Sequence, residues 1–176
     1  MKIAVISGSS RDNGNTEWLA EQAVQGYDYK LFKLREKQIQ PIHDLRHDPN
    51  GFQPVDDDYD ELIKEILEYD ILVFATPIYW YGLSGYMKNF IDRWSQSLRD
   101  CELQFKERLA TKKAYLITCG GDQPKIKGLP LVQQFQYICQ FIGMEFAGYV
   151  IGQGNAPQEV QKDTQAVEAA KGLIRA

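Results

Sequence analysis

The sequence has no basic tract, no long apolar run and no leader-like segment, and each absence excludes a class of protein. Its 20 Lys and Arg residues stand against 24 Asp and Glu residues, which gives a net charge of −4. Sequence-independent nucleic-acid binding depends on neutralising phosphates, so we expect no nucleic-acid partner. No apolar run approaches the ~20 residues of a membrane span. A strand begins almost at once, so we predict no signal peptide and a cytoplasmic protein.

Cysteine and histidine are also scarce. Cys101, Cys119 and Cys139 are widely spaced and form no Cys-x-x-Cys pair, which is typical of reduced thiols in a cytosolic protein. His43 and His47 lie four residues apart in a segment bounded by prolines, and this favours a solvated loop over a metal site. We therefore predict no metal ion. Two histidines also leave little room for a Ser/His/Asp arrangement, and none stands out.

Apolar patterning predicts strands and helices in alternation along a single domain, residues 1–176. The predicted strands are 3–6, 29–34, 71–75, 114–118 and 147–151, and the predicted helices are 17–24, 59–69, 86–98, 129–142 and 158–174. Residues 44–58 are rich in Pro and Asp, which predicts a surface loop. This alternation implies an α/β fold with a parallel sheet and helices on both of its faces.

A loop rich in hydrogen-bond donors follows the first predicted strand. It begins with Ser7, Gly8, Ser9 and Ser10, continues through Arg11 and ends at Gly14, Asn15 and Thr16. Free amides at the start of the following helix favour a phosphate, and Arg11 adds a permanent charge. Gly8 and Gly14 are one residue too far apart for a P-loop, and the residues that follow Gly8 lack the second glycine of a dinucleotide fingerprint. The loop therefore suits one terminal phosphomonoester, or else is an ordinary capped turn.

Three consecutive aromatic residues follow the third predicted strand, within residues 77–81. Adjacent aromatics in a loop indicate a flat aromatic ligand or, alternatively, a hydrophobic cap on the sheet or a dimer contact. After the fourth predicted strand, Gly120, Gly121 and Asp122 allow a backbone to approach a ligand closely, although Gly-Gly-Asp is equally a common turn. Open parallel sheets bind ligands beyond the carboxyl ends of their strands. The three loops therefore predict one pocket.

Two stretches together resemble the NADPH-dependent FMN reductase branch of the flavodoxin-like flavoproteins: residues 9–16, Ser-Ser-Arg-Asp-Asn-Gly-Asn-Thr, and residues 77–94, Pro-Ile-Tyr-Trp-Tyr-Gly-Leu-Ser-Gly-Tyr-Met-Lys-Asn-Phe-Ile-Asp-Arg-Trp. The resemblance implies a flavodoxin-like three-layer sandwich whose five-stranded parallel sheet has the order 2-1-3-4-5. It also implies bound FMN, with the phosphate on one loop and the isoalloxazine ring and ribityl chain between the other two. The implied contact residues are Ser9, Ser10, Arg11, Gly14, Asn15 and Thr16 at the phosphate, Pro77, Ile78, Tyr79 and Trp80 at the ring and ribityl chain, and Gly120, Gly121 and Asp122 on the other side.

The function that this resemblance implies is an FMN-dependent NAD(P)H oxidoreductase. Hydride would pass from NADPH or NADH through the flavin to a small acceptor such as a quinone, an azo compound or free flavin, with no catalytic side chain. The alternative is a flavodoxin-type electron carrier or flavin-binding module without NAD(P)H turnover, and the mild net charge of −4 argues against it. Arg11, Arg93 and Arg99 are candidates for the 2′-phosphate of NADPH, but their spacing does not place them.

Family members are commonly dimers or tetramers, so the resemblance also implies a homodimer or homotetramer. The candidate contact residues are Trp80, Tyr81, Tyr86 and Trp94. Related iron–sulfur flavoproteins carry a cysteine cluster in the loop after the second strand. Residues 41–48 of this chain contain no cysteine, so we expect no iron–sulfur centre.

Overall fold

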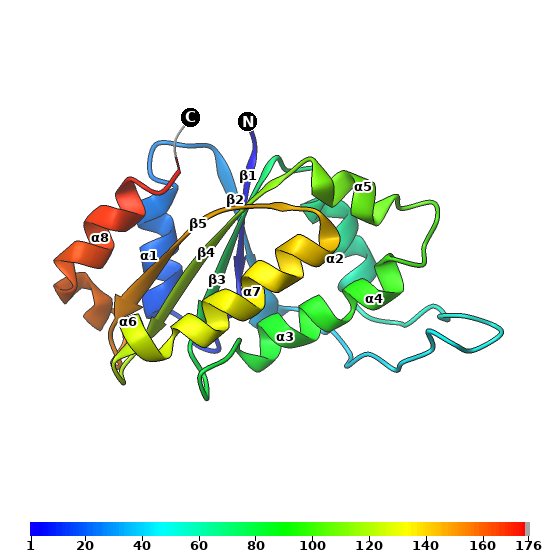
Figure 1. Cartoon of the computed structure of the whole chain (residues 1–176), viewed down its shortest axis with the longest axis horizontal. Helices are drawn as coiled ribbons and strands as arrows, with labels where there is room; N and C mark the ends of the chain where they lie inside the picture. Colours follow the sequence, from blue (N-terminus) through cyan, green and yellow to red (C-terminus); the bar gives the residue numbers. More distant parts are fainter. Residues whose placement is uncertain (175–176) are drawn as a thin grey trace.

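Five parallel strands form the centre of the structure, in the order β2-β1-β3-β4-β5 (Figure 1). The structure is a computed structural model and describes residues 1–174. The strands are β1 (Ile3–Ser7), β2 (Tyr29–Lys33), β3 (Ile71–Pro77), β4 (Lys113–Gly120) and β5 (Glu145–Gln153). The helices are α1 (Asn15–Ala23), α2 (Tyr59–Ile66), α3 (Gly85–Asp92), α4 (Trp94–Ser97), α5 (Phe105–Ala110), α6 (Pro124–Lys127), α7 (Leu129–Ile142) and α8 (Thr164–Lys171), with 3₁₀ turns η1 (Leu34–Glu36) and η2 (Glu159–Lys162). The predicted strand order is confirmed.

Helices cover both faces of the sheet because successive side chains of a strand point to opposite sides. On one face, Ile3 and Val5 pack with residues of α1 and α8. On the other face, Ile6 and Phe74 pack with residues of α2, α3, α5 and α7. Figure 1 shows these two layers, with α1 and α8 on one side of the strands and α7 and α3 on the other, so the predicted three-layer sandwich is confirmed. None of the helices within residues 1–174 is long and apolar enough to cross a membrane.

The strand order reverses at β1, which pairs with β2 on one side and with β3 on the other. Ser7 at the end of β1 is in register with Ala75, and Thr76 of β3 is in register with Thr118 of β4. The three central strands therefore end at the same edge of the sheet. This reversal is where open α/β sheets form their ligand sites, so the fold alone directs attention to the loops that leave β1, β3 and β4.

The helices differ from the prediction mainly in continuity. The predicted helix 86–98 is interrupted at Arg93, where the Gln96 N–H donates to the Arg93 carbonyl at 2.9 Å in a 3₁₀-type bond. The predicted helix 158–174 consists of η2 and α8, because Asp163 caps a new helix by accepting from the Ala166 N–H at 3.1 Å. The sequence predicts neither α5 nor α6. These helices have 6 and 4 residues, too few for apolar periodicity to reveal them.

Arg93 lies in the core, which corrects its interpretation as a candidate for binding the 2′-phosphate. Its side chain is 1% exposed, and its Nη1 donates to Asp57 Oδ2 at 2.5 Å and to the Gln40 carbonyl at 3.1 Å. Its guanidinium also lies 4.5 Å from the centre of the Tyr59 ring. These contacts anchor both ends of the segment 41–56, which projects from the molecule (Figure 1). Trp94 is likewise buried among aromatic rings, so it is not an interface contact.

Candidate functional site

The loops that follow β1, β3 and β4 are fastened to one another at the carboxyl edge of the sheet. The Gly8 N–H donates to the Ala75 carbonyl at 2.8 Å, and the Ile78 N–H donates to the Cys119 carbonyl at 2.9 Å. The Ser84 hydroxyl donates to the Gly8 carbonyl at 2.7 Å. A side chain at Gly8 would not fit, because its Cβ would come within 2.8 Å of Ser84 Oγ. The three loops therefore form one continuous surface.

The first loop presents backbone donors at the N-terminus of α1, and we name it the anion cradle for these donors. The backbone N–H groups of Asn15, Thr16 and Glu17 make no hydrogen bond to any part of residues 1–174. Unpaired amides and the positive end of the helix dipole together favour a phosphate at this point. A Cβ at Gly14 would come within 2.4 Å of Ser9 Oγ, so the loop depends on a glycine there. The donors and the close approach of the backbone fit a phosphomonoester.

Asn15 and Thr16 are more buried than their predicted role as phosphate ligands suggests. Asn15 is 5% exposed, and its side-chain Nδ2 donates to the Ala156 carbonyl at 2.9 Å. Its Oδ1 accepts from the Val160 N–H at 3.2 Å. The Asn15 amide thus ties the start of α1 to the segment before and within η2. The Asn15 side chain is therefore occupied, whereas the backbone N–H groups of Asn15 and Thr16 are free to meet an anion.

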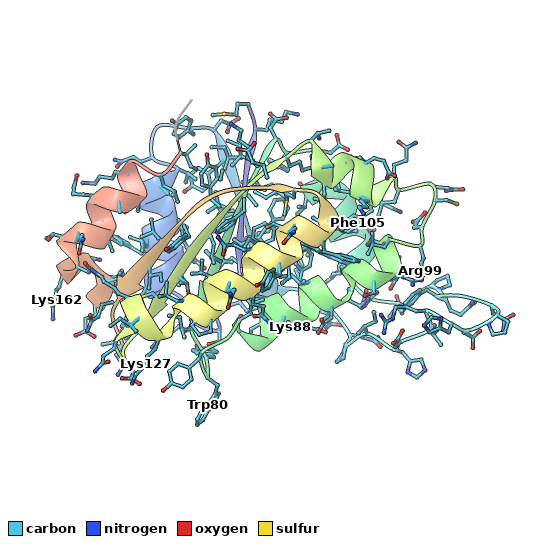
Figure 2. The ribbon with its side chains drawn as sticks, in the orientation of Figure 1. Trp80, Lys88, Arg99, Phe105, Lys127 and Lys162 are labelled. Carbon is cyan, nitrogen blue, oxygen red and sulfur yellow. The ribbon has the colours of Figure 1, made fainter. Side chains whose placement is uncertain are left out.

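Arg11 is the one of the three candidate arginines that lies at these loops. It is exposed, and its Nη2 donates to the Asn155 carbonyl at 3.0 Å across the mouth of the site. Arg99 instead donates to the Ser95 carbonyl at 3.1 Å and lies 6.0 Å from the centre of the Phe52 ring. Figure 2 shows Arg99 beside the projecting segment, far from the loops. This corrects its interpretation as a candidate for binding the 2′-phosphate.

The second loop is a tight hairpin with an unusual composition. Tyr79 and Gly82 exchange two backbone hydrogen bonds of 3.1 and 3.0 Å, so Trp80 and Tyr81 form a two-residue turn. Both turn residues have positive φ, +50° for Trp80 and +64° for Tyr81. Such turns normally contain Asn-Gly, because a bulky side chain at positive φ costs about 1–2 kcal/mol per residue. Strain of this kind collects at functional sites.

The two tyrosines of the hairpin bridge the other two loops. The Tyr79 hydroxyl lies 2.7 Å from the Ser10 hydroxyl of the first loop. The Tyr81 hydroxyl donates to Asp122 Oδ2 of the third loop at 3.0 Å. The Trp80 side chain bonds to neither of these loops and is 97% exposed. Figure 2 shows it extending beyond the rest of the protein. The hairpin is therefore fixed at its flanks and presents one free indole at its tip.

A cleft of about 370 Å³ opens beside the hairpin. It is lined by Ile78, Trp80, Tyr81, Gly120, Gly121, Asp122, Pro124, Lys127, Gly128 and Asn155. A Cβ at Gly120 would meet Ile78 Cβ at 3.3 Å, and a Cβ at Gly121 would meet Asn155 Cβ at 3.0 Å. The glycines thus keep the floor of the cleft flat. Its volume and its wall of aromatic and backbone atoms suit a planar ligand of cofactor size.

The ionisable groups at the cleft favour fixed charge over acid–base chemistry. Lys127 and then the Tyr81 hydroxyl lower the pKa of Asp122, so this exposed carboxyl remains ionised. Burial raises the pKa of Cys119 to about 12, which keeps its thiol protonated and unreactive. Among residues 1–174, no three His, Cys, Asp or Glu side chains come together as metal ligands. The cleft is therefore equipped to bind and orient a ligand.

Two buried polar residues support the loops without having been singled out by the sequence. Ser84 caps α3 by accepting from the Met87 N–H at 3.2 Å. Glu17 in the first turn of α1 accepts from Ser7 Oγ at 2.9 Å and from Arg35 Nη1 at 2.8 Å. The role of Ser84 could have been predicted from the sequence, since serine is favoured directly before a helix. The role of Glu17 could not, because its partner Arg35 is 18 positions away in η1.

The comparisons with known proteins agree on one family. The family model described as NADPH-dependent FMN reductase matches residues 1–155. The chain is 57% identical over 176 residues to YwqN of Bacillus subtilis, named as an NAD(P)H-dependent FMN-containing oxidoreductase, and the match covers 99% of this chain and 97% of that protein. An iron–sulfur flavoprotein of Methanocaldococcus jannaschii is 27% identical over 186 residues, and this match covers 98% of this chain and 93% of that protein. The solved structure of the Trp repressor binding protein of Bacillus subtilis superposes on this structure with a TM-score of 0.84. The two chains are 49% identical, and the superposition covers 98% of this chain and 97% of that one.

Proposed function

The chain belongs to the NADPH-dependent FMN reductase family and is an FMN-dependent NAD(P)H oxidoreductase, and we propose that the three loops at the carboxyl edge of the sheet hold its flavin. When bound there, FMN supplies the redox chemistry, accepting hydride from the nicotinamide and releasing electrons to a small acceptor such as a quinone, an azo compound or free flavin. The observation that carries the proposal is the row of unpaired N–H groups at the start of α1.

The first loop binds the phosphate in this proposal. Asn15 and Thr16 contribute their backbone N–H groups, and Ser9 and Ser10 contribute hydroxyls beside them. Arg11 adds a permanent positive charge at the mouth of the site. Gly14 lets the backbone of the loop close around the phosphate, because the space a Cβ would need is taken by Ser9.

The second and third loops hold the flat part of the cofactor. The segment Pro77, Ile78, Tyr79 and Trp80 forms one wall, and Gly120, Gly121 and Asp122 form the other. Support comes from Gly120 and Gly121, where a Cβ would meet Ile78 or Asn155, and from the hydrogen bonds that fix Tyr79 and Tyr81. Trp80 projects freely at the rim and can stack on a nicotinamide or on a flat acceptor. These residues position substrates, and none of them acts as an acid or a base.

Anaerobic stopped-flow mixing tests the proposed function. We expect NADPH or NADH to bleach the absorbance of the FMN-loaded protein, and a quinone, an azo dye or free flavin to restore it. A protein that forms a stable one-electron semiquinone but is not reduced by either nucleotide would instead be an electron carrier. Failure to oxidise both nucleotides with every acceptor tried contradicts the proposal.

Removing Arg11 is expected to weaken FMN binding. A hydrogen bond between a guanidinium and a phosphate contributes roughly 1.5–3 kcal/mol, so Arg11→Ala should raise the dissociation constant for FMN about tenfold or more. Quenching of flavin fluorescence on binding measures this constant. Arg46→Ala is the matched control, because Arg46 pairs with Asp44 on the exposed projecting segment. Equal affinities of the two variants would contradict the role of Arg11.

We further propose that the protein is a cytoplasmic homodimer or homotetramer. Trp80, Tyr81 and Tyr86 are all partly or fully exposed beside the site, and exposed aromatic clusters are typical of interfaces. Light scattering coupled to gel filtration measures the oligomeric state. A monomer at micromolar concentration would contradict this part of the proposal.

A further inference from the structure

Two carboxylates flank the anion cradle of the first loop. Asp12 precedes the start of α1 and is 79% exposed at its side chain, and Glu17 lies buried in the first turn of the helix. The unpaired N–H groups of Asn15 and Thr16 lie between them in the sequence. A phosphate dianion bound at those groups would therefore lie between two acidic residues of the same loop and helix turn. Like charges in a partly buried site disfavour binding unless a cation compensates them.

One side chain, Arg35, pairs with both carboxylates. Its Nη2 lies 2.5 Å from Asp12 Oδ1, and its Nη1 lies 2.8 Å from Glu17 Oε2. The Arg35 and Glu17 side chains are each 9% exposed, so water screens that pair weakly, whereas the Asp12 carboxylate is 79% exposed and its pair with Arg35 is screened more. The other charges nearby lie farther off, since Lys33 is 4.0 Å from Glu17 and Glu36 is 4.0 Å from Arg35. Arg35 is therefore the principal counter-charge of the two acids.

The position of Arg35 outside the loop is informative. It lies in η1 directly after β2, the edge strand beside β1. One guanidinium nitrogen of Arg35 donates to Asp12 and another donates to Glu17, so Arg35 joins the first loop to the first turn of α1. Glu17 is held in addition by the hydroxyl of Ser7, the last residue of β1. The cradle is thus fixed from a neighbouring strand.

We propose that Arg35 is a positioning and charge-compensating residue for the cofactor phosphate. It neutralises Asp12 and Glu17, so that the dianion meets the unpaired N–H groups without repulsion, and it holds the loop in the shape that exposes those groups. Arg35 acts on the phosphate through these two acids and makes no direct contact with it. The inference rests on the proposed function, since it requires that FMN binds at the first loop.

The test is the dissociation constant for FMN, measured by fluorescence quenching at low and high KCl. Arg35→Met should weaken binding about tenfold at low salt, and the deficit should shrink at high salt because screening weakens the repulsion. Adding Asp12→Asn to Arg35→Met should recover at least half of the lost affinity on a logarithmic scale. Arg35→Lys, which keeps the charge, should remain within a few-fold of the unaltered protein. Arg108→Met is the control, since Arg108 pairs with Glu68 elsewhere on the surface.

Two outcomes overturn the inference. If the double variant binds as weakly as Arg35→Met, Arg35 is a direct ligand or merely a structural residue. If the deficit does not change with salt, Arg35 is merely a structural residue, because a charge interaction of either kind would be screened. The single variant Asp12→Asn gives a second test that does not depend on the folding of Arg35→Met. It should bind FMN as tightly as the unaltered protein or more tightly, and a tenfold loss of affinity for FMN would overturn the inference. An unaltered protein that binds no FMN would instead refute the proposed function.

Discussion

Replacing Arg93 with leucine is expected to lower the free energy of unfolding by about 3–5 kcal/mol. The substitution leaves the Asp57 carboxylate buried without its charge partner, since both side chains are 1% exposed. It also removes the hydrogen bond to the Gln40 carbonyl and the packing of the guanidinium on the Tyr59 ring. Urea denaturation at pH 7 measures the loss. The projecting segment 41–56 should become more susceptible to proteolysis, because Arg93 no longer holds Gln40 and Asp57 at its two ends.

The matched control is Arg108→Leu, which breaks an exposed pair with Glu68. Exposed ion pairs contribute about 0–1 kcal/mol, so this variant should unfold almost as the unaltered protein does. Adding Asp57→Asn to Arg93→Leu should recover part of the loss, because the uncompensated charge is then absent. If Arg93→Leu cost no more than Arg108→Leu, the buried pair would not anchor the segment.

The same pair predicts a dependence on pH. Burial alone would raise the pKa of Asp57, but the N–H groups of Gln40 and Tyr59 and the Arg93 guanidinium hold it below its ordinary value. A carboxyl with a lowered pKa stabilises the fold above its unfolded pKa of about 4, and this contribution is lost as the pH falls through the folded value. The difference in stability between the unaltered protein and Arg93→Leu should therefore shrink below about pH 4.

The strands of the sheet could be predicted from the sequence because each strand corresponds to a short local pattern of apolar residues. The run Ile3 to Ile6 is buried on both faces in β1, and the loops after β1, β3 and β4 meet because parallel strands end at one edge. Roles that depend on distant partners were not predictable. Arg93 and Trp94 fall in an amphipathic stretch with many aromatics, and periodicity does not say which side is fully enclosed. Asn15 bonds to a residue 145 positions away, a distance over which no spacing rule operates.

The hairpin shows the same limit in a different form. The sequence predicted that three aromatics in residues 77–81 meet a ligand or a partner, and this remains a prediction. It did not predict that Trp80 and Tyr81 both take positive φ, because turn rules reserve those positions for Asn and Gly. This turn therefore departs from the usual preference for Asn and Gly at positive-φ positions, although those residues would fit a two-residue hairpin. Sites where local preference and structure disagree are expected to be functional.

Replacing Trp80 with asparagine and Tyr81 with glycine should therefore stabilise the protein and impair the enzyme. Relief of two strained positions gains about 2–4 kcal/mol, and the lost Tyr81–Asp122 bond and the added freedom of glycine offset about 1–2 kcal/mol of this. The net gain in the free energy of unfolding should lie within about 0–3 kcal/mol, with a central value of about 1.5 kcal/mol. Loss of the two rings should raise the KM for a quinone acceptor roughly tenfold, while the phosphate cradle and the affinity for FMN change less.

Gln104→Gly separates strain from function in this experiment. Gln104 also has positive φ, +49°, but it precedes α5 at the opposite end of the strands from the hairpin. Its replacement should relieve comparable strain and leave the KM for the quinone unchanged. If the hairpin variant gained no stability, the backbone conformation at Trp80 and Tyr81 would not be strained. If it gained stability and kept full activity, the two rings would serve an interface and not the substrates. A stable but impaired variant would mean that the strain is retained because it presents an indole at the rim of the cleft.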